Sequence, residues 1–185
     1  IDAGAVAVAE AALTLWGIDH EVEVRPLPNL SHGDGLLHEL PVADRVVGNP
    51  PFLNQLRSSS THTAARRTAL RERWGDLVGT YTDDAWLFIA AGLHALDTNG
   101  TLAMVQPVSV LAARYGDAVR EHVAARASLL GIWLAREQVF DAAVQVCGLV
   151  LGTGSSTAAT VERRVGADFS MVPTRLDQPA PSEWG

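Results

Sequence analysis

The sequence contains no lysine, so its 14 basic residues are all arginines. Because the two residues share a charge but differ in geometry, complete replacement indicates a coding bias more than a function. The single cysteine, Cys147, excludes an internal disulfide, and the six histidines are scattered without ligand spacing. We therefore expect a reducing, cytoplasmic environment and no bound metal.

Long apolar runs are also missing, since no segment reaches the roughly 18 uninterrupted apolar residues of a membrane span. The richest stretch, residues 85–96, is short and contains His94. There is no initiator methionine, and no basic segment leads into an apolar signal core. The first four residues, Ile-Asp-Ala-Gly, resemble the middle of a gene product. We expect a fragment of a longer chain, with no membrane partner.

What is present is enough apolar material for one domain with a core, at 185 residues and 48% hydrophobic content. The net charge of −7 argues against binding of nucleic acid through overall charge alone. The charge is unevenly distributed, however. Residues 1–50 contain eight acidic residues and two arginines, whereas residues 54–75 contain five arginines and one glutamate. The second segment is therefore a local basic island.

Helix-like and strand-like segments alternate along the chain, each identified by its apolar spacing and by the Gly, Pro or Asn that ends it. The predicted helices are 3–16 (ended by Gly17), 82–97 (with Thr82 or Asp83 as N-cap) and 110–127. The predicted strands are 20–27, 44–52 (running into a rigid turn), 101–107 (after an Asn99-Gly100 turn), 128–135 and 143–153. The alternation predicts an α/β fold with a parallel sheet covered on both faces.

Asn49-Pro50-Pro51-Phe52 follows an apolar run that predicts a buried strand. In open α/β sheets, ligands sit beyond the carboxyl ends of strands. The Asn49 amide offers an acceptor oxygen, and the two prolines fix the backbone so that the Pro50 carbonyl can accept a second hydrogen bond. Phe52 adds a flat apolar face. Two acceptors beside a stacking ring suit a planar ring that carries an exocyclic amine.

The segment Val-Val-Gly-Asn-Pro-Pro-Phe, residues 46–52, resembles the catalytic motif of N6-adenine DNA methyltransferases that use S-adenosylmethionine. Similar family segments appear in the same order elsewhere: Ile1-Asp2 with the following AGAVAVAEAAL, residues 33–36, TLAMVQPVSVL and QVFDAAVQVCGLVLG. The resemblance implies a Rossmann-like methyltransferase sheet over residues 1–153, lacking the first strand and its glycine-rich cofactor loop. Residues 154–185 would form an edge hairpin and a linker toward a missing target-recognition domain.

The resemblance also implies roles for individual residues. Asn49 and the carbonyl of Pro50, held rigid by Pro51, would bind and activate the amine of a base in double-stranded DNA. Phe52 and Phe140 would pack on the two faces of that base. The residues expected to bind S-adenosylmethionine are Asp34, Ile1 and Asp2, and those expected to contact the DNA backbone are Arg57, Arg66 and Arg67. Restriction–modification or phage defence is the expected setting.

Three other interpretations remain open. A glutamine methyltransferase that acts on release factors also uses an Asn-Pro-Pro-aromatic motif, although it usually has Tyr in the last place. Cytosine-N4 methylation usually shows Ser in the first place. A methyltransferase-like fragment without catalytic activity is the third. Carbon-5 cytosine chemistry is excluded, because Cys147 lacks a preceding proline and lies in an apolar strand.

Overall fold

The computed structural model describes residues 3–22, 30, 32–52, 64–139, 144–173 and 176–184. Most of the strand predicted at 20–27 lies outside these residues. None of the helices described is long and apolar enough to cross a membrane. The helices are α1 (Ala3–Asp19), α2 (Ala64–Trp74), α3 (Asp84–His94), α4 (Ser109–Ala112) and α5 (Asp117–Ala124). The strands are β1 (Ala43–Gly48), β2 (Leu96–Pro107), β3 (Ser128–Leu134), β4 (Val146–Gly152), β5 (Thr160–Val165), β6 (Ser170–Met171) and β7 (Leu176–Asp177).

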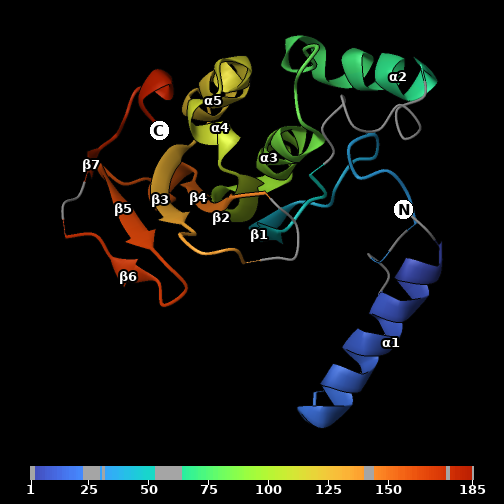
Figure 1. The fold of residues 1–185 in the computed structure, drawn as a ribbon. Coiled ribbons are helices and arrows are strands. Elements are labelled where there is room, and N and C mark those ends of the chain that lie inside the picture. The colour runs from blue at the N-terminus through green and yellow to red at the C-terminus, as the bar shows by residue number, and fades with distance from the viewer. Residues whose placement is uncertain are drawn as a thin grey trace.

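The strands form one sheet in the order β1-β2-β4-β3-β5-β6, with β7 paired to β5 (Figure 1). The prediction of a parallel sheet was wrong, because β4 runs antiparallel to both of its neighbours. Only β1 with β2 and β3 with β5 pair in parallel. Buried strands of either direction are continuous apolar runs, so composition carried no signal of this reversal. The sheet continues past residue 153 through β5 and β6.

Helices cover one face of the sheet. Trp86, Leu87 and Ile89 of α3 are buried, as are Val119 and Val123 of α5, and they share a core with residues of β2, β3 and β4. On the opposite face, no described helix covers the sheet, and Val47 is 83% exposed there. The prediction that both faces are covered is therefore wrong for the part of the chain that the structure describes.

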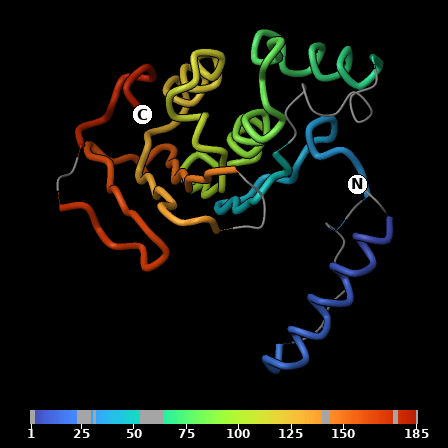
Figure 2. Tube along the Cα trace, in the orientation of Figure 1, coloured from blue at the N-terminus to red at the C-terminus, as the bar shows by residue number. Residues whose placement is uncertain are grey.

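Helix α1 extends away from the sheet (Figures 1 and 2). Its alanine-rich sequence favours a helix, as predicted, but the helix continues through Gly17 to Asp19. Its large apolar side chains, among them Val8, Leu15 and Trp16, are exposed. The helix therefore contributes little to the core described above.

The helix predicted over residues 110–127 is divided into α4, a 3-10 turn and α5. Ala113 is extended, with φ −65° and ψ 130°, and this breaks the helical run. The buried Arg120 guanidinium donates to the carbonyls of Val110 at 2.7 Å and Ala113 at 3.1 Å, and the Ala113 carbonyl also accepts a hydrogen bond from the Gly116 N–H at 2.9 Å. The Asn99-Gly100 turn was also placed wrongly: it lies within β2, where the pairing with β1 shifts register.

Candidate functional site

The Asn-Pro-Pro-Phe segment lies directly beyond the carboxyl end of β1, whose last residue, Gly48, pairs with Met104 of β2. Pro50 is buried, and Phe52 is half-buried against the core. The side chain of Asn49 is exposed and makes no hydrogen bond to the described residues. An amide in this position has its oxygen and both of its N–H groups available for a ligand.

The edge of the sheet at which β1 ends gathers other segments. Because β2 runs parallel to β1, its last residue, Pro107, lies at the same edge, and α4 follows it. Helix α3 ends at His94, just before β2 begins at the opposite edge of the sheet. The first turn of α3, with Asp84, therefore lies toward the edge that holds Asn49. Asp83 caps this helix by accepting a hydrogen bond from the Ala85 N–H at 2.9 Å, which confirms one of the two predicted N-caps.

Asp34 lies in a short loop that packs on α2 and α3. Its Oδ1 accepts a hydrogen bond from the Leu36 N–H at 3.1 Å. Leu36 is fully buried, and its carbonyl accepts a hydrogen bond from Trp74 Nε1 at 2.8 Å. A β-carbon at Gly35 would lie 3.2 Å from the Phe88 ring, so the loop and α3 are in close contact there. The backbone around Asp34 is therefore tightly held.

Arg66 of α2 connects this loop to α3. Its Nε donates to Asp34 Oδ2 at 2.6 Å, and its Nη1 lies 2.8 Å from Asp84 Oδ2. The Asp84 side chain is 1% exposed, that of Arg66 19% and that of Asp34 28%. One guanidinium thus bridges a carboxylate on the loop and a buried carboxylate on the helix. We call these three side chains the Asp34–Arg66–Asp84 bridge.

The contacts of the bridge favour the ionised forms of Asp34 and Arg66. Burial alone would raise the pKa of Asp34, but the hydrogen bonds from Arg66 and the Leu36 N–H, with the Arg66 charge, lower it below its ordinary value. Burial likewise opposes the charge of Arg66. The hydrogen bond to Asp34 and the nearby charge of Asp84 outweigh this effect and raise the Arg66 pKa. Asp34 is therefore a carboxylate that can accept a hydrogen bond from a donor group.

The other predicted site residues divide into two groups. Ile1, Asp2, Arg57 and Phe140 lie outside the described residues. Arg67 is exposed on α2, whereas the guanidinium of Arg66 is turned toward two carboxylates. The roles predicted for these residues stay predictions. No group of three or more metal-ligating side chains occurs among the residues described.

Sequence reasoning missed Asp84, although a signal was available. Asp84 shares a helix face with Leu87 and Ala91, both buried, so an acidic residue stands in an apolar stripe. Arg66 is spaced four and eight residues from Leu70 and Trp74, the two buried residues of α2. A charged residue at such a position needs a buried partner of opposite charge. A basic residue on the buried face of α2 and an acidic residue on the buried face of α3 together indicate an internal ion pair.

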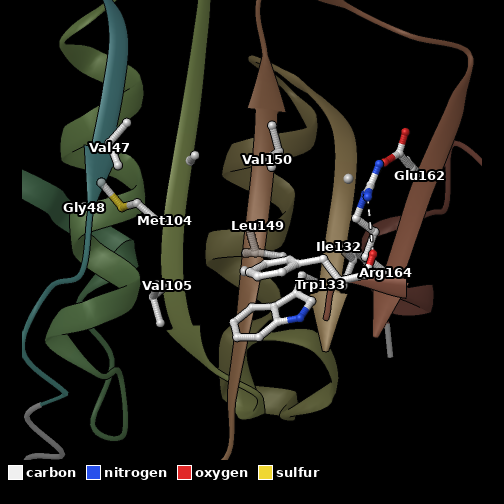
Figure 3. A pocket seen from close by; sticks show the side chains of 14 residues that line it. Val47, Gly48, Met104, Val105, Ile132, Trp133, Leu149, Val150, Glu162 and Arg164 are labelled. Carbon is white, nitrogen blue, oxygen red and sulfur yellow. Dashed lines mark hydrogen bonds and ion pairs between the residues drawn. The ribbon is translucent and has the colours of Figure 1, made fainter. Parts of the chain in front are cut away.

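A hollow of about 340 Å³ lies on the uncovered face of the sheet. Figure 3 shows the side chains of Val47, Trp133 and Val150 on this face, with the Arg164–Glu162 ion pair at its border. Its lining is almost entirely apolar and includes neither Asp34 nor any residue of the Asn-Pro-Pro-Phe segment. The hollow is therefore separate from the groups that carry the predicted chemistry.

Comparisons with known proteins bear on the fold. A family model described as Eco57I restriction-modification methylase matches residues 42–140. A search of the curated proteins found no match. Among solved structures, the M protein of the EcoKI type I restriction enzyme is 20% identical with a TM-score of 0.62, and the match covers 89% of this chain and 34% of that one.

Two further solved structures are similar. A type I restriction-modification methyltransferase subunit from Streptococcus thermophilus is 19% identical with a TM-score of 0.57, over 90% of this chain and 36% of that one. A Listeria monocytogenes protein assigned to the class I S-adenosylmethionine-dependent methyltransferases is 14% identical with a TM-score of 0.55, over 72% and 40%. The chain thus spans about a third to two fifths of these relatives. The predicted Rossmann-like methyltransferase fold class is confirmed.

Proposed function

Because the chain belongs to the Eco57I restriction-modification methylase family, we propose that its site transfers a methyl group from S-adenosylmethionine to the N6 amine of adenine in double-stranded DNA. The observation that carries the proposal is the amide of Asn49, which lies exposed beyond the carboxyl end of β1, beside the buried Pro50, and makes no hydrogen bond to the part of the chain that the structure describes. Restriction–modification is the expected biological setting, with a target-recognition domain as a partner.

The residues at this edge would activate the amine by orienting it. The Asn49 oxygen and the Pro50 carbonyl accept the two amine hydrogens, and this draws the nitrogen lone pair out of conjugation with the ring. The half-buried Phe52 offers the base a stacking surface. The base must first leave the DNA stack, which costs a few kcal/mol.

S-adenosylmethionine, when bound, supplies the electrophilic methyl group on its sulfonium. The new N–C bond forms as the C–S bond breaks, and the amine then releases one proton to solvent. Asp34 would accept a hydrogen bond from the adenine amine of the cofactor, which its ionised state permits. The contribution of the protein is therefore orientation and electrostatic support, with no covalent enzyme intermediate.

The test is transfer of tritiated methyl groups to unmethylated duplex DNA, with the chain and with any longer protein that carries it. Asn49→Ala should lower kcat at least about 100-fold, since removing one oriented polar contact to the reacting group typically costs that much. Thr98→Ala is the matched control, because Thr98 is an exposed polar residue near the start of β2, at the opposite edge of the sheet. Nuclease digestion of the product should release N6-methyladenine.

Two outcomes would overturn the proposal. One is label that arrives in glutamine of a protein, or nowhere. The other is an Asn49→Ala variant that methylates DNA as fast as the Thr98→Ala control. Circular dichroism of each variant shows whether a loss of activity reflects a loss of folding.

A further inference from the structure

We propose that Arg66 is a positioning residue, which holds the carboxylate of Asp34 in the orientation that the adenine amine of the cofactor requires. The Asp34–Arg66–Asp84 bridge carries this inference, which rests on the proposed function for the role of Asp34. In this role Arg66 would act through Asp34. Arg66 belongs to α2, and the sequence resemblance implied a contact with the DNA backbone for it.

The first step is that the Asp34 carboxylate can accept hydrogen bonds from Arg66 and from a ligand at the same time. Its Oδ1 accepts from the Leu36 N–H, and its Oδ2 accepts from Arg66 Nε. An ionised carboxylate offers about four acceptor positions, so about two remain after these bonds. Because the two existing bonds fix both oxygens in space, the remaining acceptor positions point in defined directions.

The second step is that Arg66 is itself anchored. Its Nη1 lies 2.8 Å from the carboxylate of Asp84, which is 1% exposed in the first turn of α3. Leu70 and Trp74 bury the same face of α2 against the core. The guanidinium therefore connects Asp34 to a buried carboxylate of α3.

The third step concerns the residue type. The two carboxylates are reached by two different nitrogens of one planar fork, Nε and Nη1. Lysine has a single ammonium on a flexible stem and cannot reproduce this geometry. A purely electrostatic role would tolerate lysine, whereas a positioning role requires arginine.

The experiment compares four variants with the wild-type chain. Arg66→Ala removes the bridge, and Arg66→Lys keeps the charge without the fork. The double variant Arg66→Ala/Asp84→Asn removes the bridge without leaving a buried carboxylate unpaired, which protects folding. Arg71→Ala is the control, since Arg71 is an exposed arginine on the same helix.

Two measurements follow. Amide hydrogen exchange at Leu36 reports the Asp34 carboxylate directly and needs no cofactor. It should accelerate at least about tenfold in Arg66→Ala and in the double variant, and stay unchanged in Arg71→Ala. In the methylation assay, the KM for S-adenosylmethionine should rise about tenfold in the same two variants, while kcat changes by less than about twofold. Arg66→Lys should resemble Arg66→Ala in both measurements, and a lysine variant that behaves like wild type would contradict the positioning role.

The outcomes separate this inference from the proposed function. If wild type methylates DNA and the Arg66 variants keep its cofactor KM, or if Leu36 exchange is unchanged, the inference is wrong and the function stands. If wild type transfers no methyl group, the proposed function fails, and the cofactor role inferred for Arg66 fails with it. A loss in kcat alone would also contradict positioning of Asp34.

Discussion

Removal of the buried Arg120 side chain should lower the free energy of unfolding substantially. Its side chain is 2% exposed and donates to the carbonyls of Val110 and Ala113, at the end of α4, and to the carboxylate of Asp117. These bonds fix the segment that follows β2 at the edge of the sheet that holds Asn49. Arg120→Ala leaves two backbone carbonyls without this donor.

The magnitude follows from these contacts. Hydrogen bonds to a charged group contribute about 1.5–3 kcal/mol each, so the two carbonyl bonds together contribute about 3–6 kcal/mol. The ion pair with Asp117, a side chain 51% exposed, adds little. Removing the buried guanidinium also recovers part of its desolvation cost, including that of the unbonded Nε. We expect a net loss of about 3 kcal/mol in the free energy of unfolding.

Urea unfolding followed by circular dichroism measures this loss. Arg126→Ala is the control, because Arg126 is exposed on the turn after α5 and, among the described residues, its side chain donates one bond of 3.3 Å, to the His122 carbonyl. It should lose less than about 0.5 kcal/mol. A loss below about 1 kcal/mol in Arg120→Ala, or equal losses in the two variants, would refute the assignment of Arg120 as the clamp of this segment.

Two further predictions concern buried titratable groups. Burial, together with Arg126 and His94, lowers the pKa of His122 to about 4, so the unfolded chain binds a proton there that the folded chain does not. Stability should therefore fall as pH drops from about 6.5 toward 4. The His122→Gln variant should reduce the change in unfolding free energy between pH 7 and pH 5 by about 1 kcal/mol. Chemical denaturation at several pH values measures this, and a pH profile equal to that of wild type would contradict it. Burial also raises the pKa of Cys147 to about 12. Iodoacetamide at pH 8 should therefore alkylate Cys147 at least about 100-fold more slowly in the folded chain than in urea. Equal alkylation rates in the two states would contradict this prediction.

Local patterns in the sequence predicted several elements correctly, but they did not predict α2, and they predicted the strand partners poorly. The helix start at Asp83 and the strand from Ser128 follow from capping chemistry and apolar runs, and both are confirmed. The antiparallel direction of β4 does not follow from such local patterns, because strand direction depends on which strands pair. An apolar run has the same composition in a parallel and in an antiparallel strand. The break at Ala113 depends on Arg120, seven residues further on, so helical spacing alone could not show it.

The same division applies to the candidate site. The Asn-Pro-Pro-Phe segment was identified because its chemistry is contained in four neighbouring residues. The Asp34–Arg66–Asp84 bridge joins residues up to 50 positions apart. The apolar spacing around Arg66 and Asp84 is a signal of buried helix faces, but it does not say which charged residues meet. Pairing at that distance is decided by tertiary packing, which local periodicity does not contain.

The uncovered face of the sheet has a practical consequence for anyone who handles the protein. Environment-sensitive dyes that fluoresce on apolar surfaces are commonly used to report loose or molten states. Val47, Val105 and Trp133 offer such dyes a ready surface in the folded chain. A bright signal at room temperature would then describe the native molecule, and a dye-based melting curve would start from a high baseline. Unfolding of this protein is better followed by backbone circular dichroism than by dye fluorescence.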